Sequence, residues 1–174
     1  MAIGPDESGL VIPALELIPL VEEFRRRFDP SARAGVPPHV TVVGPFLDPE
    51  LLTDRVFQQL DRLVAPTRPF AYSLAAVREF AGGVLYLAPD PPEPFVALTQ
   101  LVSRRFRIKP YGGAYKDVVP HLTVSQTATE AERSEIATVL AKSIPVWARA
   151  TEVWVMTGHN DRTWTTVRSI AFSG

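Results

Sequence analysis

The chain has 174 residues, 46% of them hydrophobic, which is enough for one domain with a sizeable core and excludes a disordered chain. The net charge of −1 and the pI of about 6.3 argue against a protein that coats long nucleic acid, but they allow a local positive pocket for a nucleotide or an RNA end. There is no cysteine, so disulfides, thiolate nucleophiles and cysteine-ligated zinc are excluded. The N-terminal apolar run is short and broken by prolines, and we expect a cytoplasmic protein without a membrane span.

The first half of the chain predicts strands and helices in alternation. The apolar run at 10–15 predicts a strand, and apolar side chains at spacings of three and four over 16–28 are typical of an amphipathic helix. After a loop, we expect a strand at 38–43, a helix at 49–64 that prolines end, and a strand at 70–80.

The second half repeats this order after a hairpin turn at the Ala-Gly-Gly of 81–83. Thr129, with Glu132 three residues later, has the pattern of a capping box and marks the start of the second helix of this half. The elements expected here are a strand at 84–87, helices at 94–106 and 128–142, and strands at 119–125, 146–156 and 163–171.

Strand, helix, strand, helix and strand thus occur twice, in half-units at roughly 8–80 and 82–171. The repeat predicts a single bilobal α+β domain over 1–174. We expect a duplicated unit in which two mostly antiparallel sheets, flanked by helices, surround a central cleft.

The same pentapeptide pattern occurs once in each half-unit. It reads PHVTV at 38–42 and PHLTV at 120–124, and it uses two of the three histidines of the chain. Because side chains alternate between the faces of a strand, each copy places its histidine and threonine on one face and its aliphatic residues on the other. The residues on the shared faces are His39, Thr41, His121 and Thr123.

Two imidazoles and two hydroxyls around one small volume suit phosphoester hydrolysis without a metal. One neutral histidine can take a proton from the attacking water or hydroxyl, and one protonated histidine can give a proton to the leaving oxygen. The threonine hydroxyls can donate to the phosphate oxygens as charge develops on them. One histidine beside a threonine in a strand would be ordinary structure, but two copies at equivalent positions favour a catalytic pair.

His39-Val-Thr41 and His121-Leu-Thr123 resemble the HxT/S pair that names the 2H phosphoesterase superfamily. PPHVTVVGPF and the loop that ends in PHLT are similar to the motifs of its 2′-5′ RNA ligase and RNA 2′,3′-cyclic phosphodiesterase branch. In one respect the sequence departs from the pattern, because Ser125-Gln126 stands where close members often carry an arginine.

The resemblance implies a metal-independent enzyme, without a cofactor, that acts on 2′,3′-cyclic phosphates or 2′-5′ linkages. By analogy His39 is the acid and His121 the base in cyclic phosphate hydrolysis, and ligation uses the same pair in the opposite sense. The expected partner is a nucleotide or an RNA end, and we expect a monomer.

Four residues near the motifs are candidates to bind the rest of the substrate. Tyr111 and Tyr115 lie in the loop before the second motif and could stack on a base. Phe46 could do the same, although packing in the core is the alternative. Lys116, five residues before His121, is the candidate phosphate contact.

Other polar and aromatic groups have simpler interpretations. The cations around 104–109 fit a helix C-terminus, and the alternative is a basic rim that steers phosphates. Arg25, Arg26 and Arg27 are interpreted as the solvated face of a helix. The three tryptophans, Trp147, Trp154 and Trp164, are interpreted as residues of the core or of a sheet face.

Three other hypotheses fit the sequence. The same cleft could belong to a non-catalytic module that binds an RNA end or a nucleotide. The three histidines, with His159 as the third, could hold zinc. Last, the repeat could be a structural duplication with no ligand at all.

Overall fold

The computed structural model describes residues 7–114, 116–159 and 162–174. Its strands are β1 (Ser8–Pro13), β2 (His39–Val43), β3 (Phe70–Glu79), β4 (Leu85–Asp90), β5 (Leu122–Ser125), β6 (Val146–Ala150), β7 (Glu152–Gly158) and β8 (Trp164–Ala171). Its helices are η1 (Leu15–Leu17), α1 (Ile18–Phe28), α2 (Pro30–Arg33), η2 (Pro49–Leu51), α3 (Asp54–Val64), α4 (Glu93–Phe106), η3 (Pro110–Gly113) and α5 (Glu130–Ala141).

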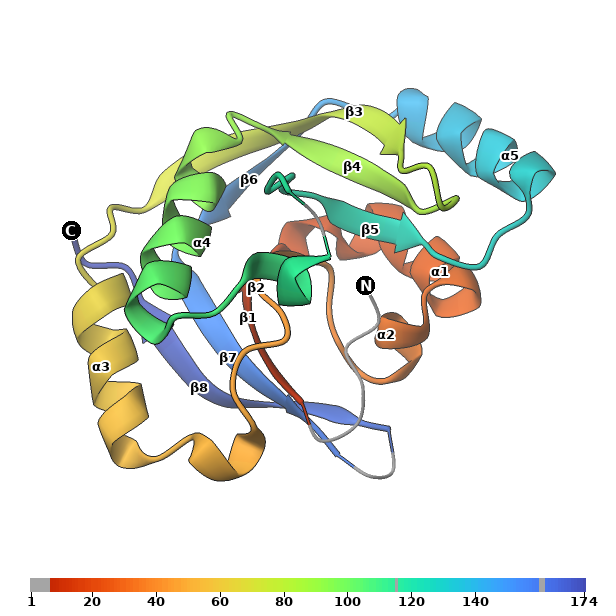
Figure 1. Cartoon of the computed structure of the whole chain (residues 1–174). Helices are drawn as coiled ribbons and strands as arrows, with labels where there is room; N and C mark the ends of the chain where they lie inside the picture. Colours follow the sequence, from red (N-terminus) through yellow and green to blue (C-terminus); the bar gives the residue numbers. More distant parts are fainter. Residues whose placement is uncertain (1–6, 115, 160–161) are drawn as a thin grey trace.

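The strands form two antiparallel sheets of four strands each, in the orders β2-β1-β7-β8 and β5-β4-β3-β6. In Figure 1 the sheet of β3 to β6 lies across the top, and β1, β7 and β8 run below it. One hydrophobic core joins the two sheets, with buried residues such as Leu10 and Val40 from the first and Leu74 and Leu122 from the second. The predicted α+β class with two antiparallel sheets flanked by helices is confirmed.

The two sheets have equivalent strand orders if the chain is read as two half-units. β1 and β2 of the first half correspond to β4 and β5 of the second, and both motif strands lie at a sheet edge. Each half also contributes to the sheet of the other, so that β3 of the first half lies beside β4, and β7 of the second half lies beside β1. The order agrees with a duplication, and neither half completes its own sheet.

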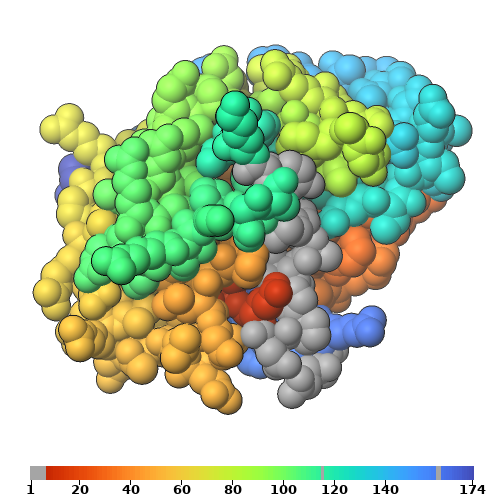
Figure 2. Space-filling model, in the orientation of Figure 1, coloured from red at the N-terminus to blue at the C-terminus, as the bar shows by residue number. Residues whose placement is uncertain are grey.

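The helices also cross between the halves. α1 packs against β5, the second motif strand, and α4 packs against β2, the first. Each motif strand is therefore supported by a helix from the other half. In the space-filling view, α4 and η3 form one continuous green surface above the orange segment that follows β2 (Figure 2).

Local sequence signals account for several element boundaries. Thr129 and Glu132 form the predicted capping box at the start of α5. Asp29 caps the short helix α2 by accepting from the N–H of Ser31, and this helix lies in a segment that was predicted to be a loop.

One predicted strand is wrong in an informative way. The segment at 146–156 is two strands, since β6 pairs with β3 in one sheet and β7 pairs with β1 in the other. The chain passes between the sheets at Thr151, which belongs to neither strand. Periodicity did not reveal the change because both strands are partly buried and only one residue separates them.

Among the residues that the structure describes, no helix is both long and apolar enough to cross a membrane.

Candidate active site

The two motifs lie on neighbouring strands from different sheets, because β2 and β5 are in contact. Along β2, His39 and Thr41 are half-buried while Val40 and Val42 are buried, and the second motif repeats this alternation. Leu122 and Val124 are buried, with Thr123 half-buried between them and His121 half-buried just before β5. The predicted division of faces is therefore present in both copies.

Both histidine rings are held by the same local hydrogen bond. Nδ1 of His39 lies 2.7 Å from the carbonyl oxygen of Pro37, and Nδ1 of His121 lies 2.7 Å from that of Val119. Because a carbonyl oxygen can only accept, each Nδ1 carries the proton. The neutral form of each ring therefore presents Nε2 as its free acceptor, the atom that can take or return a proton.

The site of His39 disfavours a positive charge. Burial lowers the pKa of His39 from 6.5 to about 4, and the Arg25 guanidinium and the His121 ring add to this lowering, while the bond to Pro37 and the Asp29 carboxylate oppose the shift. The contribution of His121 shows that the two imidazoles are within electrostatic reach of each other. His39 is therefore neutral in the free protein near pH 7.

Aromatic side chains surround His121. The centroid of its ring lies 5.0 Å from that of Phe80, 5.6 Å from that of Tyr86 and 6.2 Å from that of Tyr111. Tyr86 pairs with Thr123 across β4 and β5, so that both point to the face of the site. Burial lowers the pKa of His121, and its bond to Val119 opposes this.

Tyr111 is a predicted substrate residue whose ring lies beside a motif histidine. Its φ of 54° lies in the left-handed region, which is unfavourable for a tyrosine and is found most often where the surroundings fix the backbone. Its hydroxyl donates to the carbonyl oxygen of Val119 over 3.3 Å, the same oxygen that accepts from Nδ1 of His121. Tyr111 thus supports the hydrogen bond that orients His121.

The structure corrects the interpretation of Arg25 as a solvated residue. Arg26 and Arg27 are exposed as expected, but Arg25 is only 1% exposed and donates through Nε and Nη2 to Oδ2 of the fully buried Asp29, at 3.2 and 3.0 Å. Its place on the helix carried a signal, since it lies four residues after Val21 and three before Phe28, both buried on the core face.

The other predicted substrate residues are placed less directly. Phe46 is 7% exposed and packs edge-on against Phe106 at 5.0 Å, so the alternative of core packing is correct and its ring is not available to a base. Lys116 is exposed, and a phosphate contact by it stays a prediction. Tyr115 lies outside the described residues.

The cations at the end of α4 and the tryptophans mostly match their simpler interpretations. Arg104 and Arg105 lie in the last turn of α4, where they complement the helix dipole. Trp154 is half-buried and pairs with Val11, which pairs in turn with Thr41, so it shares the sheet face of the first motif. Trp147 is 67% exposed on β6 and belongs to neither the core nor the site.

His159 is not part of the site. It follows β7, and its Nε2 lies 2.8 Å from the hydroxyl of Thr165. Across residues 7–114, 116–159 and 162–174, no three side chains of histidine, cysteine, aspartate or glutamate are grouped so that they could hold a metal ion. The zinc hypothesis therefore lacks the third histidine on which it depended.

Solved structures with this fold include proteins crystallised with nucleotides. E. coli LigT in complex with 3′-AMP superposes with a TM-score of 0.60 over 98% of this chain and 100% of that chain, at 15% identity. A protein of Thermus thermophilus superposes with a TM-score of 0.64 over 97% of this chain and 98% of that chain, at 16% identity. At such low identities the likeness concerns the fold.

Sequence comparison extends the likeness to a family. A Bacillus cytotoxicus protein that is provisionally named a phosphoesterase is 30% identical over 131 residues, 74% of each chain. A similarly named Bacillus licheniformis protein is 29% identical over 136 residues, covering 74% of this chain and 75% of its own. The profile of the 2′-5′ RNA ligase superfamily matches residues 13–162, a range that holds both motifs and most of the chain. The chain therefore belongs to the 2′-5′ RNA ligase superfamily of 2H phosphoesterases.

Proposed function

We propose that this protein is a metal-independent phosphodiesterase that opens 2′,3′-cyclic phosphates, on an RNA end or a small nucleotide, by general acid–base catalysis with His39 and His121. The observation that carries the proposal is the pair of matched histidines. Each donates Nδ1–H to the carbonyl two residues before it, and each leaves Nε2 for proton transfer. The fold that it shares with LigT, which was crystallised with 3′-AMP, supports a nucleotide substrate.

The reaction needs one proton acceptor and one proton donor. The neutral histidine takes a proton from water as the water oxygen bonds to phosphorus. The protonated histidine gives a proton to the ribose oxygen as the phosphorus–oxygen bond to that oxygen breaks. The products are a ribose hydroxyl and a phosphate monoester on the adjacent oxygen, and solvent then restores the starting protonation of the pair. Ligation in the 2′-5′ sense would use the same two transfers, with an RNA 5′-hydroxyl in place of water as the attacking group, and cleavage of the 2′-5′ linkage would run them in reverse.

The free protein must acquire the proton that the acid donates. Burial lowers the pKa of both histidines, so both are mainly neutral at pH 7. A cyclic phosphate between the rings would favour the imidazolium, because an anion close to a base stabilises its protonated form. Substrate binding would therefore help to charge the acid, and analogy with the family assigns this role to His39.

The threonines and the neighbouring aromatic residues have proposed roles around the phosphate. Thr41 and Thr123 lie on the same faces as the histidines and would donate to its non-bridging oxygens. Tyr111 would contact the nucleoside while it orients His121, and Lys116 would approach the phosphate from the loop. A cytoplasmic location and a monomeric state stay predictions.

The decisive experiment incubates the protein with 2′,3′-cyclic AMP and with a short RNA that ends in a 2′,3′-cyclic phosphate, in the presence of EDTA. We expect the wild type to open the ring, and His39→Ala and His121→Ala to fail. The position of the product phosphate identifies the leaving oxygen. Activity that EDTA abolishes would contradict metal independence.

A non-catalytic binding module is the second candidate, favoured by the neutral state of both histidines in the free protein. It predicts that a nucleotide 2′-phosphate raises the melting temperature while the cyclic substrate stays intact after long incubation. Ring opening by the wild type would exclude it.

A further inference from the structure

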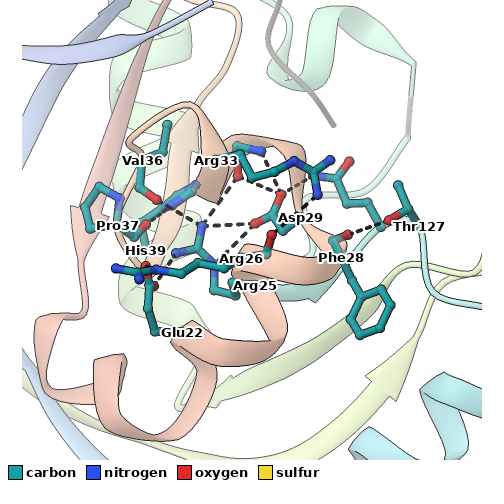
Figure 3. A network of polar contacts seen from close by, with 12 residues as sticks. Glu22, Arg25, Arg26, Phe28, Asp29, Arg33, Val36, Pro37, His39 and Thr127 are labelled. Atoms are coloured by element: carbon teal, nitrogen blue, oxygen red, sulfur yellow. Dashed lines mark hydrogen bonds and ion pairs between the residues drawn. The ribbon is translucent and has the colours of Figure 1, made fainter.

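The buried ion pair of Arg25 and Asp29 is the centre of a polar network beside the first motif (Figure 3). Oδ2 of Asp29 accepts both bonds from Arg25, and Oδ1 accepts from the backbone N–H and the hydroxyl of Ser31 at 3.0 and 2.7 Å. Oδ1 also accepts from the side-chain amide of Gln126 at 2.8 Å. Both carboxylate oxygens are therefore fully bonded although the residue is buried.

The network reaches the first motif through the backbone. Nη2 of Arg25 donates to the carbonyl oxygen of Val36 over 3.1 Å. The next residue, Pro37, supplies the carbonyl that orients His39, and prolines at 37 and 38 restrict the backbone between that bond and the histidine. Arg25 thus holds the peptide segment from which His39 takes its orientation.

The network reaches the second motif through Gln126, which directly follows β5. Besides the bond from its side chain to Asp29, its backbone N–H donates to the carbonyl oxygen of Phe28 at 2.8 Å. The backbone N–H and hydroxyl of Thr127 donate to the same oxygen, both at 3.1 Å. The last turn of α1 is therefore bonded to both motif segments, which belong to different sheets.

A gain in stability alone does not explain why such an ion pair is buried here. Two buried charges lose their hydration, and well-packed apolar residues often stabilise a protein equally well. Exposed arginines lie next to it in the sequence, at 26 and 27, so α1 did not need a buried cation for solubility. The position of the pair between the motifs gives it a specific use.

We propose that Arg25 and Asp29, with Gln126, are positioning residues that fix the two catalytic histidines relative to each other. This inference deepens the proposed function and rests on it for its kinetic consequences. The network acts through backbone carbonyls and the end of β5, and touches no reacting atom. Misplacement of a catalytic group by about 1 Å can cost about 100-fold in rate, so a small loss of register would be visible in kcat.

The first test follows His39 directly and does not depend on activity. Arg25→Met with Asp29→Asn removes both charges at once, leaves no unpaired buried ion, and keeps an acceptor for Ser31 and Gln126. The charged groups that face His39 are Arg25 and Asp29 of the α1 segment and His121 of the second motif. Because the effect of Arg25 exceeds that of Asp29, we expect the NMR titration of His39 to move to higher pH. Arg26→Met, which changes an exposed arginine on the same helix, should leave the titration unchanged.

The second test measures ring opening of 2′,3′-cyclic AMP. We expect the double variant to lower kcat by about 10- to 100-fold with little change in KM. Gln126→Ala, which cuts only the side-chain link from Asp29 to the second motif, should lower kcat without moving the titration of His39. Arg26→Met should keep the wild-type kcat.

The outcomes separate this inference from the proposed function. Folded variants with wild-type kcat would overturn the positioning role, even if the titration of His39 had moved. If the double variant does not fold, folded Gln126→Ala with wild-type kcat is sufficient to overturn it. If the wild type opens no cyclic phosphate, the proposed function fails. The titration of His39 in the double variant then still tests the placement of the ion pair. An unchanged pKa of His39 would overturn that placement, and a raised pKa would support it.

Discussion

The two motifs are nearly identical in sequence, but they have different surroundings. The first is supported by charge, with Arg25 and Asp29 behind the peptide that orients His39. The second is supported by aromatic rings, with Phe80, Tyr86 and Tyr111 around His121. The cross-strand partners differ in the same sense, since Thr41 pairs with Val11 and Thr123 pairs with Tyr86.

This difference shows that the repeated motif determines how each histidine ring is oriented, whereas the neighbouring residues determine its electrostatic environment. The bond from Nδ1 to a carbonyl is 2.7 Å long in both copies because the Pro-His segment makes it within itself. A nearby cation penalises the imidazolium of His39. His121 lies instead beside the aromatic rings of Phe80 and Tyr86. The two histidines therefore differ in their surroundings although their motifs are nearly the same.

The largest expected effect tests whether the two copies act as one unit. His39→Gln and His121→Gln should each lower kcat/KM for a 2′,3′-cyclic nucleotide by about 10²- to 10⁴-fold, because each removes one proton transfer. The double variant should be little worse than either single variant, since one missing partner already disables the pair. Multiplying effects in the double variant would show that the histidines act independently.

The ion pair that supports the first motif can be broken by a substitution at Asp29. Asp29→Ala leaves the buried Arg25 without its carboxylate, and we expect the free energy of unfolding to fall by about 3–5 kcal/mol in a urea titration. Asp61→Ala is the matched control, because it removes the ion pair of Asp61 and Arg168 on the surface and should cost at most about 1 kcal/mol. Equal losses in both variants would show that burial does not distinguish the two pairs.

The lowered pKa of His39 predicts a loss of stability in acid. The unfolded chain, in which His39 titrates near 6.5, binds this proton more readily than the folded protein, in which the pKa is about 4. The stability that the folded protein gains from a neutral His39 is complete above pH 6.5. As the pH falls toward 4, the free energy of unfolding decreases by up to about 3 kcal/mol. Urea titrations should show the free energy of unfolding of the wild type falling relative to that of His39→Gln over this window. A constant difference between them would contradict the shift.

The pH dependence of catalysis sharpens the same point. One histidine must be protonated and the other neutral, and kcat/KM reports the pKa values of the free protein. Since burial lowers both, the optimum of kcat/KM should lie below pH 6.5. An optimum above pH 7 would show that other groups carry the protons.

The smallest expected effect concerns the aromatic residues around His121. Tyr111→Phe keeps the ring beside His121 and removes the hydroxyl that donates to Val119. We expect kcat to fall less than 10-fold and the free energy of unfolding to fall by about 1 kcal/mol, the usual contribution of one hydrogen bond. Tyr111→Ala should lower kcat further, because it also removes the ring. Equal kcat values for the two variants would restrict the role of Tyr111 to its hydroxyl.

The sequence predicted those parts of the molecule that depend on short-range rules. The faces of His39 and Thr41 follow from strand alternation, and the start of α5 follows from its capping box. The pairing of β3 and β7 in opposite sheets was not predictable, because strand partners distant in sequence leave no mark on either strand. Arg25 was misread because a solvated arginine is the usual case, and its burial depends on partners such as Asp29 and the carbonyl of Val36 that the sequence does not place.

The exchange of β3 and β7 between the sheets has a consequence for this asymmetry. A half-chain made separately could complete its sheet only by exchanging a strand with a second copy, as in a strand-swapped homodimer. Such a dimer would give both histidines the same neighbours, since one gene would encode both. In a single chain that joins the halves, each copy can mutate without the other. Covalent linkage therefore permits a cation beside one imidazole and aromatic rings beside the other.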